Sequence, residues 1–470
     1  MTATEFPRLV LDKSMALFDE AKRLSPGGVM GIRRPYNFVQ GEYPIFIDRG
    51  YGGHIVDVDG NDYIDMLCAY GPIILGYNEP EINEAVIRQM TDRGFCFSLV
   101  QPVQNAFERR ITEIVPCAEQ VIPVKTGSDA TTLATRIARG YTDRTVILRC
   151  GYHGWHDWCV ENHGGVPDQV LALTDEFEYG DIASLEAKIA AHAGEVACII
   201  VTPVGHPLAR PVIPPPPGYL QAVRDIATRE GVVLIFDEVR TGFRVAMGGA
   251  QARYGVTPDL ATFGKAVANG YAISFVAGKR EIMSVCEKKV FVSSTYFPNS
   301  LEMVAALKCI EILEREQVPA AIWARGTRFL ERLTEIVGAS GVPATVSGIP
   351  PMPFVTFDQG PGEGPGTQRE KVYKARREYF YYDETDLMAV RVNAWKMHIG
   401  VKPEGIWWDE KYYPSVPYVF NLLMDPMEKM DPQSKEWGYI GRKFFAQKMW
   451  AATASGSFLG AHLKSLQDYP

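Results

Sequence analysis

The chain has 470 residues, of which 46% are hydrophobic and 22% charged, a composition that excludes a largely disordered protein. Its 48 basic and 56 acidic residues give a net charge of −8 without a dense basic cluster, which argues against nucleic acid as the main partner. No apolar run reaches the roughly 20 residues of a membrane span, no signal-peptide core opens the chain, and the eight cysteines are scattered. We therefore expect a cytoplasmic protein with reduced thiols, no membrane contact and no metal site.

The N-terminal part predicts a helix followed by a small antiparallel meander. Residues 11–24 have helical spacing and stop at a Ser-Pro-Gly-Gly run. Segments 44–49, 54–59 and 62–66 alternate between apolar and polar residues, with Asp59-Gly60-Asn61 as a turn. Two further helices are predicted at about 81–93 and 103–115.

From residue 121 onward, strand patterns alternate with helix patterns. The strands are predicted at 121–125, 145–149, 196–202, 232–236 and 272–277, and the helices between them at about 130–140 and 218–229. Repeated strand–helix units with apolar strands indicate an α/β protein with a largely parallel sheet and helices on both faces.

The C-terminal part does not continue this alternation. Helices are predicted at 301–315 and 320–337, followed by a strand-like stretch at 344–357 and a glycine- and proline-rich loop at 359–366. The remainder is rich in aromatic residues, and 435–466 is expected to be mostly helical. The N-terminal meander and this C-terminal part are predicted to form a second domain.

An aspartate and a lysine in the middle of the chain are the first candidates for chemistry. The apolar strand 232–236 ends at Asp237, and ligands of open α/β sheets bind at the carboxyl ends of strands. Lys265 lies among small and apolar residues, where desolvation lowers the pKa of an amine and favours a nucleophile. Pyridoxal phosphate needs this pair: the carboxylate keeps its pyridine nitrogen protonated, and the lysine forms a Schiff base.

Three loops supply candidate cofactor contacts. In the turn 126–129, Ser128 is the predicted N-cap of a helix whose free N–H groups bind phosphate, and Gly127 allows a close backbone approach. Tyr152 or Trp155, in the loop after strand 145–149, can stack on a planar ring. Thr295 offers a hydroxyl in a polar turn before the next helix.

Seven ordered motifs run through residues 10–340: Ser25–Val29, Asp57–Asn61 with Tyr63–Asp65, Gly127–Ala130, Gly151–Gly154, Asp237–Val239 with Thr241–Arg244, Pro258–Leu260, and Phe263–Lys265. On these motifs the chain resembles the class III aminotransferases, pyridoxal-phosphate enzymes of fold type I, and most of all the glutamate-1-semialdehyde aminomutase branch. The resemblance implies a mostly parallel seven-stranded sheet flanked by helices, with a smaller α+β domain formed by both termini. The expected domains are an N-terminal segment at 1–70, a large domain at 71–325 and a C-terminal small domain at 326–470.

The resemblance also implies a role for each matching residue. Lys265 becomes the Schiff-base lysine and proton carrier, and Asp237 the partner of the pyridine nitrogen. The other expected cofactor-binding residues are Gly127, Ser128, Tyr152, His153, Val239 and Thr295, with Thr295 supplied by the partner subunit of a homodimer with shared active sites. Arg34 and Trp155 are expected at the substrate, where the guanidinium of Arg34 fits a carboxylate.

These roles predict an aminotransferase that moves an amino group between an amino compound and a keto acid or aldehyde by a ping-pong mechanism. An isomerase, whether an aminomutase, racemase or epimerase, needs the same lysine and cofactor, so the motifs leave both open. A dinucleotide oxidoreductase is disfavoured, because no Gly-x-Gly-x-x-Gly follows a strand. Asp129 and Thr202 stand where the family usually has glutamate, and the resemblance fades after about residue 360, so the substrate also stays open.

Overall fold

A computed structural model describes residues 9–29, 46–205 and 212–357 in full, together with the backbone of four strands between 378 and 421. Arg34 and the predicted helix at 435–466 lie outside the described residues. The chain divides into two compact units, Met1–Pro365 and Gly366–Pro470. The expected domain boundaries at residues 70 and 325 stay predictions.

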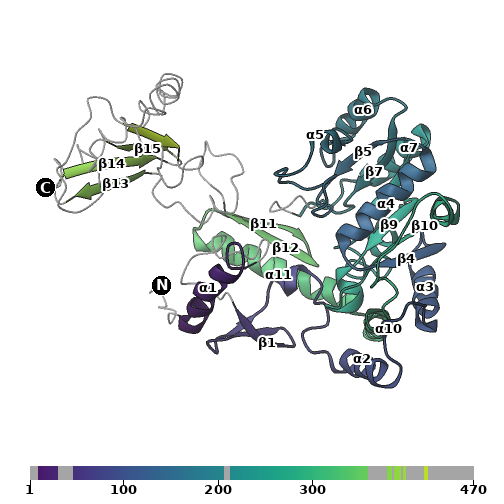
Figure 1. Cartoon of the computed structure of the whole chain (residues 1–470), viewed down its shortest axis with the longest axis horizontal. Coiled ribbons are helices and arrows are strands. Elements are labelled where there is room, and N and C mark those ends of the chain that lie inside the picture. Colours follow the sequence, from purple (N-terminus) through teal and green to yellow (C-terminus); the bar gives the residue numbers. More distant parts are fainter. Residues whose placement is uncertain are drawn as a thin grey trace. The chain divides into compact units, whose positions relative to one another are not determined.

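The first unit is built on a seven-stranded sheet of order β4-β10-β9-β8-β7-β5-β6 (Figure 1). Neighbouring strands from β9 to β6 are parallel, whereas β10 is antiparallel to both β9 and β4. The expected mostly parallel seven-stranded sheet is therefore confirmed. The strand bounds are β4 (Gln120–Val124), β5 (Val146–Cys150), β6 (Thr174–Glu176), β7 (Val196–Val201), β8 (Val233–Asp237), β9 (Leu260–Phe263) and β10 (Ser274–Gly278).

Helices cover both faces of this sheet, because its central strands are apolar on both sides. In β8, Leu234 and Phe236 pack into one core with α3, α7 and α10, while Val233 and Ile235 pack into a second core with α4. The helix bounds are α2 (Pro80–Asp92), α3 (Pro102–Ile114), α4 (Gly127–Thr142), α5 (Asp168–Leu171), α6 (Ile182–Ala191), α7 (Tyr219–Glu230), α8 (Gly249–Tyr254), α9 (Arg280–Met283), α10 (Ser300–Arg315) and α11 (Val318–Ser340), with the short 3₁₀ helices η3 (Cys68–Tyr70), η4 (Lys265–Ala268) and η5 (Ser284–Glu287).

The N-terminal elements agree with the expected helix and meander. Helix α1 (Asp12–Leu24) precedes β1 (Ile47–Tyr51), β2 (His54–Asp57) and β3 (Asp62–Ile64), which form an antiparallel sheet of order β1-β2-β3. The carboxylate of Asp59, in the turn between β2 and β3, accepts hydrogen bonds from the backbone N–H groups of Lys13 (2.7 Å) and Ser14 (2.9 Å). An anion at this helix start complements the helix dipole and joins α1 to the meander.

The stretch expected as one strand at 344–357 forms a hairpin of β11 (Ala344–Ile349) and β12 (Met352–Phe357). Pro350 and Pro351 separate the two strands, and proline lacks the N–H group that a continuous strand ladder needs. The second unit contains a four-stranded antiparallel sheet of order β13-β14-β15-β16, with bounds β13 (Glu378–Asp383), β14 (Asp386–Val392), β15 (Trp395–His398) and β16 (Tyr418–Asn421).

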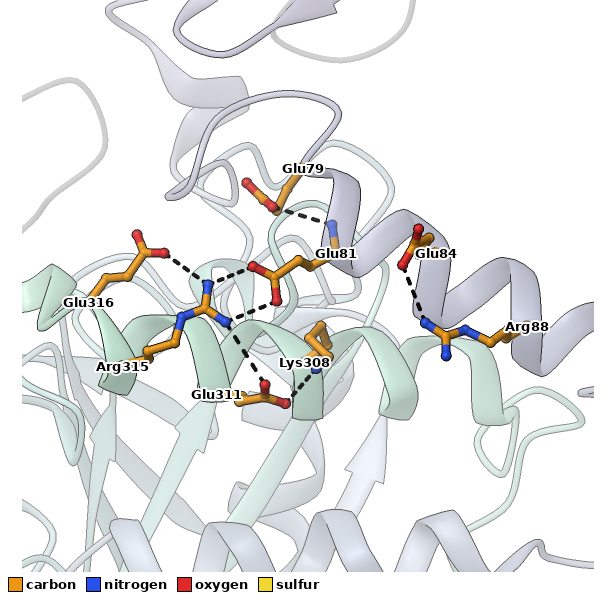
Figure 2. Close-up of polar contacts among 8 residues, drawn as sticks. All are labelled: Glu79, Glu81, Glu84, Arg88, Lys308, Glu311, Arg315 and Glu316. Carbon is orange, nitrogen blue, oxygen red and sulfur yellow. Dashed lines mark hydrogen bonds and ion pairs between the residues drawn. The ribbon is translucent and has the colours of Figure 1, made fainter.

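A network of charged side chains joins α2 to α10 (Figure 2). Arg315 makes two hydrogen bonds to the carboxylate of Glu81, at 2.9 and 2.6 Å, and a third to Glu316 at 2.9 Å. These groups are exposed, so each ion pair contributes little to the stability of the fold. Helix α10 also packs against η4, where the thiol of Cys309 lies 3.5 Å from the carbonyl oxygen of Ala266. The network thus supports the helix on which η4 rests.

Candidate functional site

The carboxyl ends of β8 and β9 bring the two central candidates to one edge of the sheet. Asp237 is the last residue of β8 and pairs with Thr262 of β9. Lys265 begins η4, two residues after the end of β9. Parallel pairing therefore places residues that are 28 positions apart in the chain at the same edge, as expected for a ligand site of an α/β sheet.

Three donors orient the carboxylate of Asp237, which is 5% exposed. Thr262 Oγ1 and the backbone N–H of Val239 donate to Oδ1 over 3.2 and 3.1 Å, and His153 Nδ1 lies 2.8 Å from Oδ2. The imidazole of His153 is buried and stacks on Trp158, with a ring separation of 6.1 Å. His153 was predicted to bind the cofactor, and in the structure it contacts Asp237.

The backbone at Lys265 is in the left-handed region, with φ of 49°. Burial lowers the pKa of its amine to about 8, and the nearby guanidinium groups of Arg240 and Arg244 act in the same direction, while Asp237 opposes them. At pH 7, about a tenth of such amines are neutral, against fewer than about one in a thousand for an ordinary lysine. A neutral amine is what nucleophilic or base chemistry requires.

The turn before α4 differs from the prediction in its capping residue. Thr126, not Ser128, is the N-cap, because its extended backbone lets its hydroxyl accept from the N–H of Asp129 (3.1 Å). The carboxylate of Asp129 accepts in return from the N–H of Thr126 (2.8 Å), which completes a capping box. Ser128 lies in the first turn, where its Oγ accepts from the N–H of Trp155 over 3.3 Å. Among the described residues, the N–H groups of Gly127 and Ser128 have no acceptor.

Close packing at Gly127 joins this turn to the strand that carries Asp237. A Cβ at Gly127 would lie 2.9 Å from Cγ1 of Val239, so a larger residue would push the two segments apart. Gly154 meets the same turn from the aromatic loop, since a Cβ there would lie 2.3 Å from Ser128 Oγ. The turn before α4, the aromatic loop and the end of β8 are therefore packed against one another.

Three predicted residues are less closely tied to this centre. Tyr152 is partly buried, which raises the pKa of its phenol, whereas Trp155 is 69% exposed. Thr295 is exposed in the turn before α10, and no hydrogen bond within the described part of the chain links it to another predicted ligand. Arg34, expected at the substrate, lies outside the described residues.

The structure adds two arginines that the sequence analysis did not select. Arg244 donates to the carbonyl oxygen of Gly71 over 2.5 Å, and burial lowers the pKa of its guanidinium. Arg240 Nη1 is buried without a hydrogen-bond partner among the described residues. Arg244 belongs to the motif Thr241–Arg244, but the motif gave it no role. Nothing in the local pattern marks Arg240, because an arginine between Asp237 and Lys265 can equally well point to solvent.

The neighbouring acid, Glu238, has a structural role. Its fully buried carboxylate accepts from Thr241 Oγ1 (2.5 Å) and from the N–H groups of Ala250 (2.6 Å) and Gln251 (3.0 Å), while burial raises its pKa. It holds the loop after β8 against α8. Of these two neighbouring acids, Asp237 is the one whose charge acts on the pKa of Lys265.

The residues at this edge have the groups that pyridoxal phosphate requires. They supply an oriented carboxylate for a pyridine nitrogen and an amine of lowered pKa for the aldehyde. Two free N–H groups at a helix start suit a phosphate. The close approach of Gly127 to Val239 leaves no room for a side chain between the turn before α4 and the segment after β8. Within the described ranges, no group of three acidic, histidine or cysteine side chains could hold a metal ion, and no helix is long and apolar enough to cross a membrane.

Comparisons with known proteins point to the same chemistry. The family model described as Aminotransferase class-III matches residues 36–360. A 3-aminobutyryl-CoA aminotransferase from Cloacimonas acidaminovorans (strain Evry) is 57% identical over 350 residues, which cover 74% of this chain and 84% of the relative. A glutamate-1-semialdehyde 2,1-aminomutase from Methanocella arvoryzae is 38% identical over 342 residues, covering 69% and 79%. The solved structure of the PLP form of the FumI protein from Sphingopyxis sp. MTA144 has 29% identity and a TM-score of 0.72, covering 74% and 84%.

Proposed function

The chain belongs to the class III aminotransferase family, and on this basis we propose that the residues around Lys265 and Asp237 form its cofactor site. We also propose that the enzyme acts on β-amino acyl compounds. The activity itself is pyridoxal-phosphate-dependent transamination, as the family and the 57% identical aminotransferase show. The bound cofactor supplies an electron sink for negative charge that develops on the amine-bearing carbon. The observation that carries the site assignment is a lysine of lowered pKa beside a buried, oriented aspartate.

In this proposal, residues in the loops at the carboxyl ends of the strands hold the cofactor. The N–H groups of Gly127 and Ser128 bind its phosphate at the start of α4, where the helix dipole favours an anion. Val239 and Tyr152 would pack against the pyridine ring. Asp237 keeps the pyridine nitrogen protonated, and the contact with His153 prevents its carboxylate from turning away.

Lys265 would then serve as base and acid. Its amine would take a proton from the amine-bearing carbon of the substrate and would later give that proton up again, so Lys265 would act first as base and then as acid. An amine with a pKa of about 8 can act as base and as acid near neutral pH, because its neutral and its protonated form are both populated there.

The substrate proposal rests on the name of the 57% identical relative, a 3-aminobutyryl-CoA aminotransferase. We assign this chain to small compounds with an amino group β to a carbonyl. Arg34 and Trp155 remain the proposed substrate residues. The guanidinium of Arg34 would bind a carboxylate of the donor or of the acceptor.

Mass spectrometry of a matched set of donors tests this proposal. We expect the purified enzyme to convert 3-aminobutyryl-CoA or 3-aminobutyrate at least about tenfold faster than the isomeric 2-aminobutyrate, since misplacing the reacting carbon weakens the transition state. Each donor consumed should yield one molecule of aminated 2-oxoglutarate or pyruvate. Preference for 2-aminobutyrate would reject the substrate proposal. Conversion of a donor with no keto acceptor present would favour an isomerase.

The proposed homodimer is supported by apolar side chains that the single chain leaves in water. Leu99 and Val100 before α3, and Phe291 and Tyr296 on either side of Thr295, are between 60% and 79% exposed. Large exposed apolar residues gathered in a few segments are typical of contact surfaces. A second copy that covers them would bring Thr295 toward the phosphate of the partner's site.

Light scattering of the purified protein is expected to give the mass of two chains. Leu99→Glu combined with Phe291→Glu should produce the mass of one chain, because charges would be buried in the contact surface. Ile336→Glu on α11, where the native side chain is 53% exposed, is the control and should stay dimeric. A wild-type protein with the mass of one chain at micromolar concentration contradicts the proposal.

A further inference from the structure

Residues 68–71 form a left-handed turn between the meander and α2. The three residues of η3, Cys68–Tyr70, have φ values of 51°, 53° and 67°, and Gly71 follows with φ of 104°. Side chains disfavour this region of the backbone, so residues other than glycine usually adopt it singly. Three such residues in a row persist only where contacts with the surrounding structure impose them, and such strain clusters at functional sites.

Gly71, at the end of this turn, lies beside both Lys265 and Arg244. A Cβ built on Gly71 would lie 3.6 Å from Cδ of Lys265 and 3.9 Å from Nη2 of Arg244. The same Nη2 donates a hydrogen bond to the carbonyl oxygen of Gly71 over 2.5 Å. Arg244 is buried, and a hydrogen bond from a buried charged group is stronger than one in water. The turn is therefore joined to a buried cation at the point where it contacts the lysine.

The residues before the turn are held by Asp65. One oxygen of its carboxylate accepts from the backbone N–H groups of Leu67 (2.9 Å) and Cys68 (3.1 Å). The other oxygen accepts from the hydroxyl of Tyr77 over 2.7 Å. Asp65 thus fixes the start of the turn and connects it to the end of the same segment.

The residues after the turn are held by Asn269, which follows η4. Its Oδ1 accepts from the N–H groups of Ile74 and Leu75, both at 2.9 Å, and its Nδ2 donates to the carbonyl oxygen of Gly76 over 2.8 Å. Because η4 begins at Lys265, the segment after the turn is bound to the same short helix as the lysine. Arg244 adds a fixed point at the turn itself.

Arg244 also acts on the lysine through its charge. Burial lowers the pKa of the Lys265 amine, the charges of Arg240 and Arg244 lower it further, and Asp237 opposes them. Gly71 carries no charge, so it can act on the lysine only through the shape of the turn. A change at each of these two positions therefore separates the effect of the turn from the effect of the charge.

We propose that Arg244 is a positioning residue for Lys265. Through its hydrogen bond to Gly71 it holds the left-handed turn against the lysine, and the turn limits both the movement of the amine and its access to water. The contact is at Cδ, which is joined to the amine nitrogen through a single carbon, so a small displacement of the turn moves the reacting group. The proposal rests on the role in proton transfer proposed above for Lys265.

Hydrogen exchange of the full-length holoenzyme tests whether Arg244 holds the turn. We expect Arg244→Met to speed exchange in a peptide covering residues 66–73 by about tenfold or more, because a local contact that keeps the segment closed is lost. Arg244→Lys should restore part of the protection, since it keeps a cationic donor. Gly71→Ala should also speed exchange, because a side chain disfavours a φ of 104°.

The pH dependence of kcat tests whether the turn acts on the lysine. Lys265 must be neutral to take a proton, so a higher pKa moves the acid limb of the profile to higher pH. We expect a shift of about one unit or more for Arg244→Met, which loses the turn and the charge, and about half a unit or more for Gly71→Ala, which keeps the charge. Gly194→Ala is the matched control: its φ is 79°, a Cβ there meets nothing within 4 Å, and it precedes β7 at the opposite edge of the sheet, so neither measurement should change.

Three results would overturn the proposal. Faster exchange with an unchanged pH profile would give Arg244 a purely structural role. A shifted profile in Arg244→Met with wild-type exchange, and no shift in Gly71→Ala, would leave only the effect of the charge. Wild-type behaviour of both variants would remove any role of the turn. The proposed function fails separately, if borohydride reduction of the wild-type holoenzyme leaves no cofactor on Lys265, whatever the exchange rates are.

Discussion

Lys265→Ala is expected to lower transamination by more than about 10⁴-fold, because one residue supplies both the covalent attachment and the proton transfer. Lysine already carries a Cβ at this left-handed position, so alanine adds no new backbone strain and the fold should persist. The measurement is the initial rate with the best donor, together with the protein mass after borohydride reduction. Wild type should gain the mass of one reduced cofactor, and the variant none.

A matched lysine controls for general effects of the substitution. Lys288 lies in an exposed segment after η5 with no ion pair among the described residues, and Lys288→Ala should keep both the rate and the reduced adduct. An adduct that persists in Lys265→Ala would show that another lysine holds the cofactor. A rate within tenfold of wild type would remove Lys265 from the chemistry.

Asp237→Asn is expected to reduce the rate by about 10²–10³-fold, as does the loss of a preorganised charge in other active sites. The amide keeps the size of the side chain and can still bond Thr262 and the N–H of Val239. It cannot hold a positive charge on the pyridine nitrogen, so the ring accepts electrons less readily. The measurement combines the rate with the affinity for pyridoxal phosphate from a spectral titration.

Thr262→Val is the companion variant for Asp237. It removes one 3.2 Å hydrogen bond and leaves the carboxylate with the other two donors. We expect a rate loss of less than about tenfold, in line with about 1 kcal/mol for one hydrogen bond. If Asp237→Asn loses no more activity than Thr262→Val, the reaction does not depend on the negative charge of Asp237.

Much of the architecture could be predicted because it depends on local signals. Strand β8 was predicted at 232–236 and lies at Val233–Asp237, one residue later. All its residues are buried, so no alternation of apolar and polar residues indicates where the strand begins and ends. Strands β6 and β9 were missed, being three and four residues long. The proline pair at 350–351 marks the hairpin turn, yet the apolar pattern on either side resembles one continuous strand.

The capping residue of α4 shows how a local prediction fails. Thr126 and Ser128 are both good N-cap residues by type. The choice between them depends on the partner three positions later: Asp129 can close a capping box with Thr126. Asp129, which departs from the family's usual glutamate, is the residue that decides the helix start.

The sequence by itself determined which side chains we propose for the reaction. Asp237 ends an apolar strand and Lys265 stands among small residues, and both environments are visible in their immediate neighbours. Only the tertiary structure decided how these groups are tuned. His153 reaches Asp237 across 84 positions, and the charges of Arg240 and Arg244 lower the pKa of Lys265, because loops from separate strands meet at one edge of the sheet. Such contacts depend on strand order and loop packing, which the pattern of one chain segment does not contain.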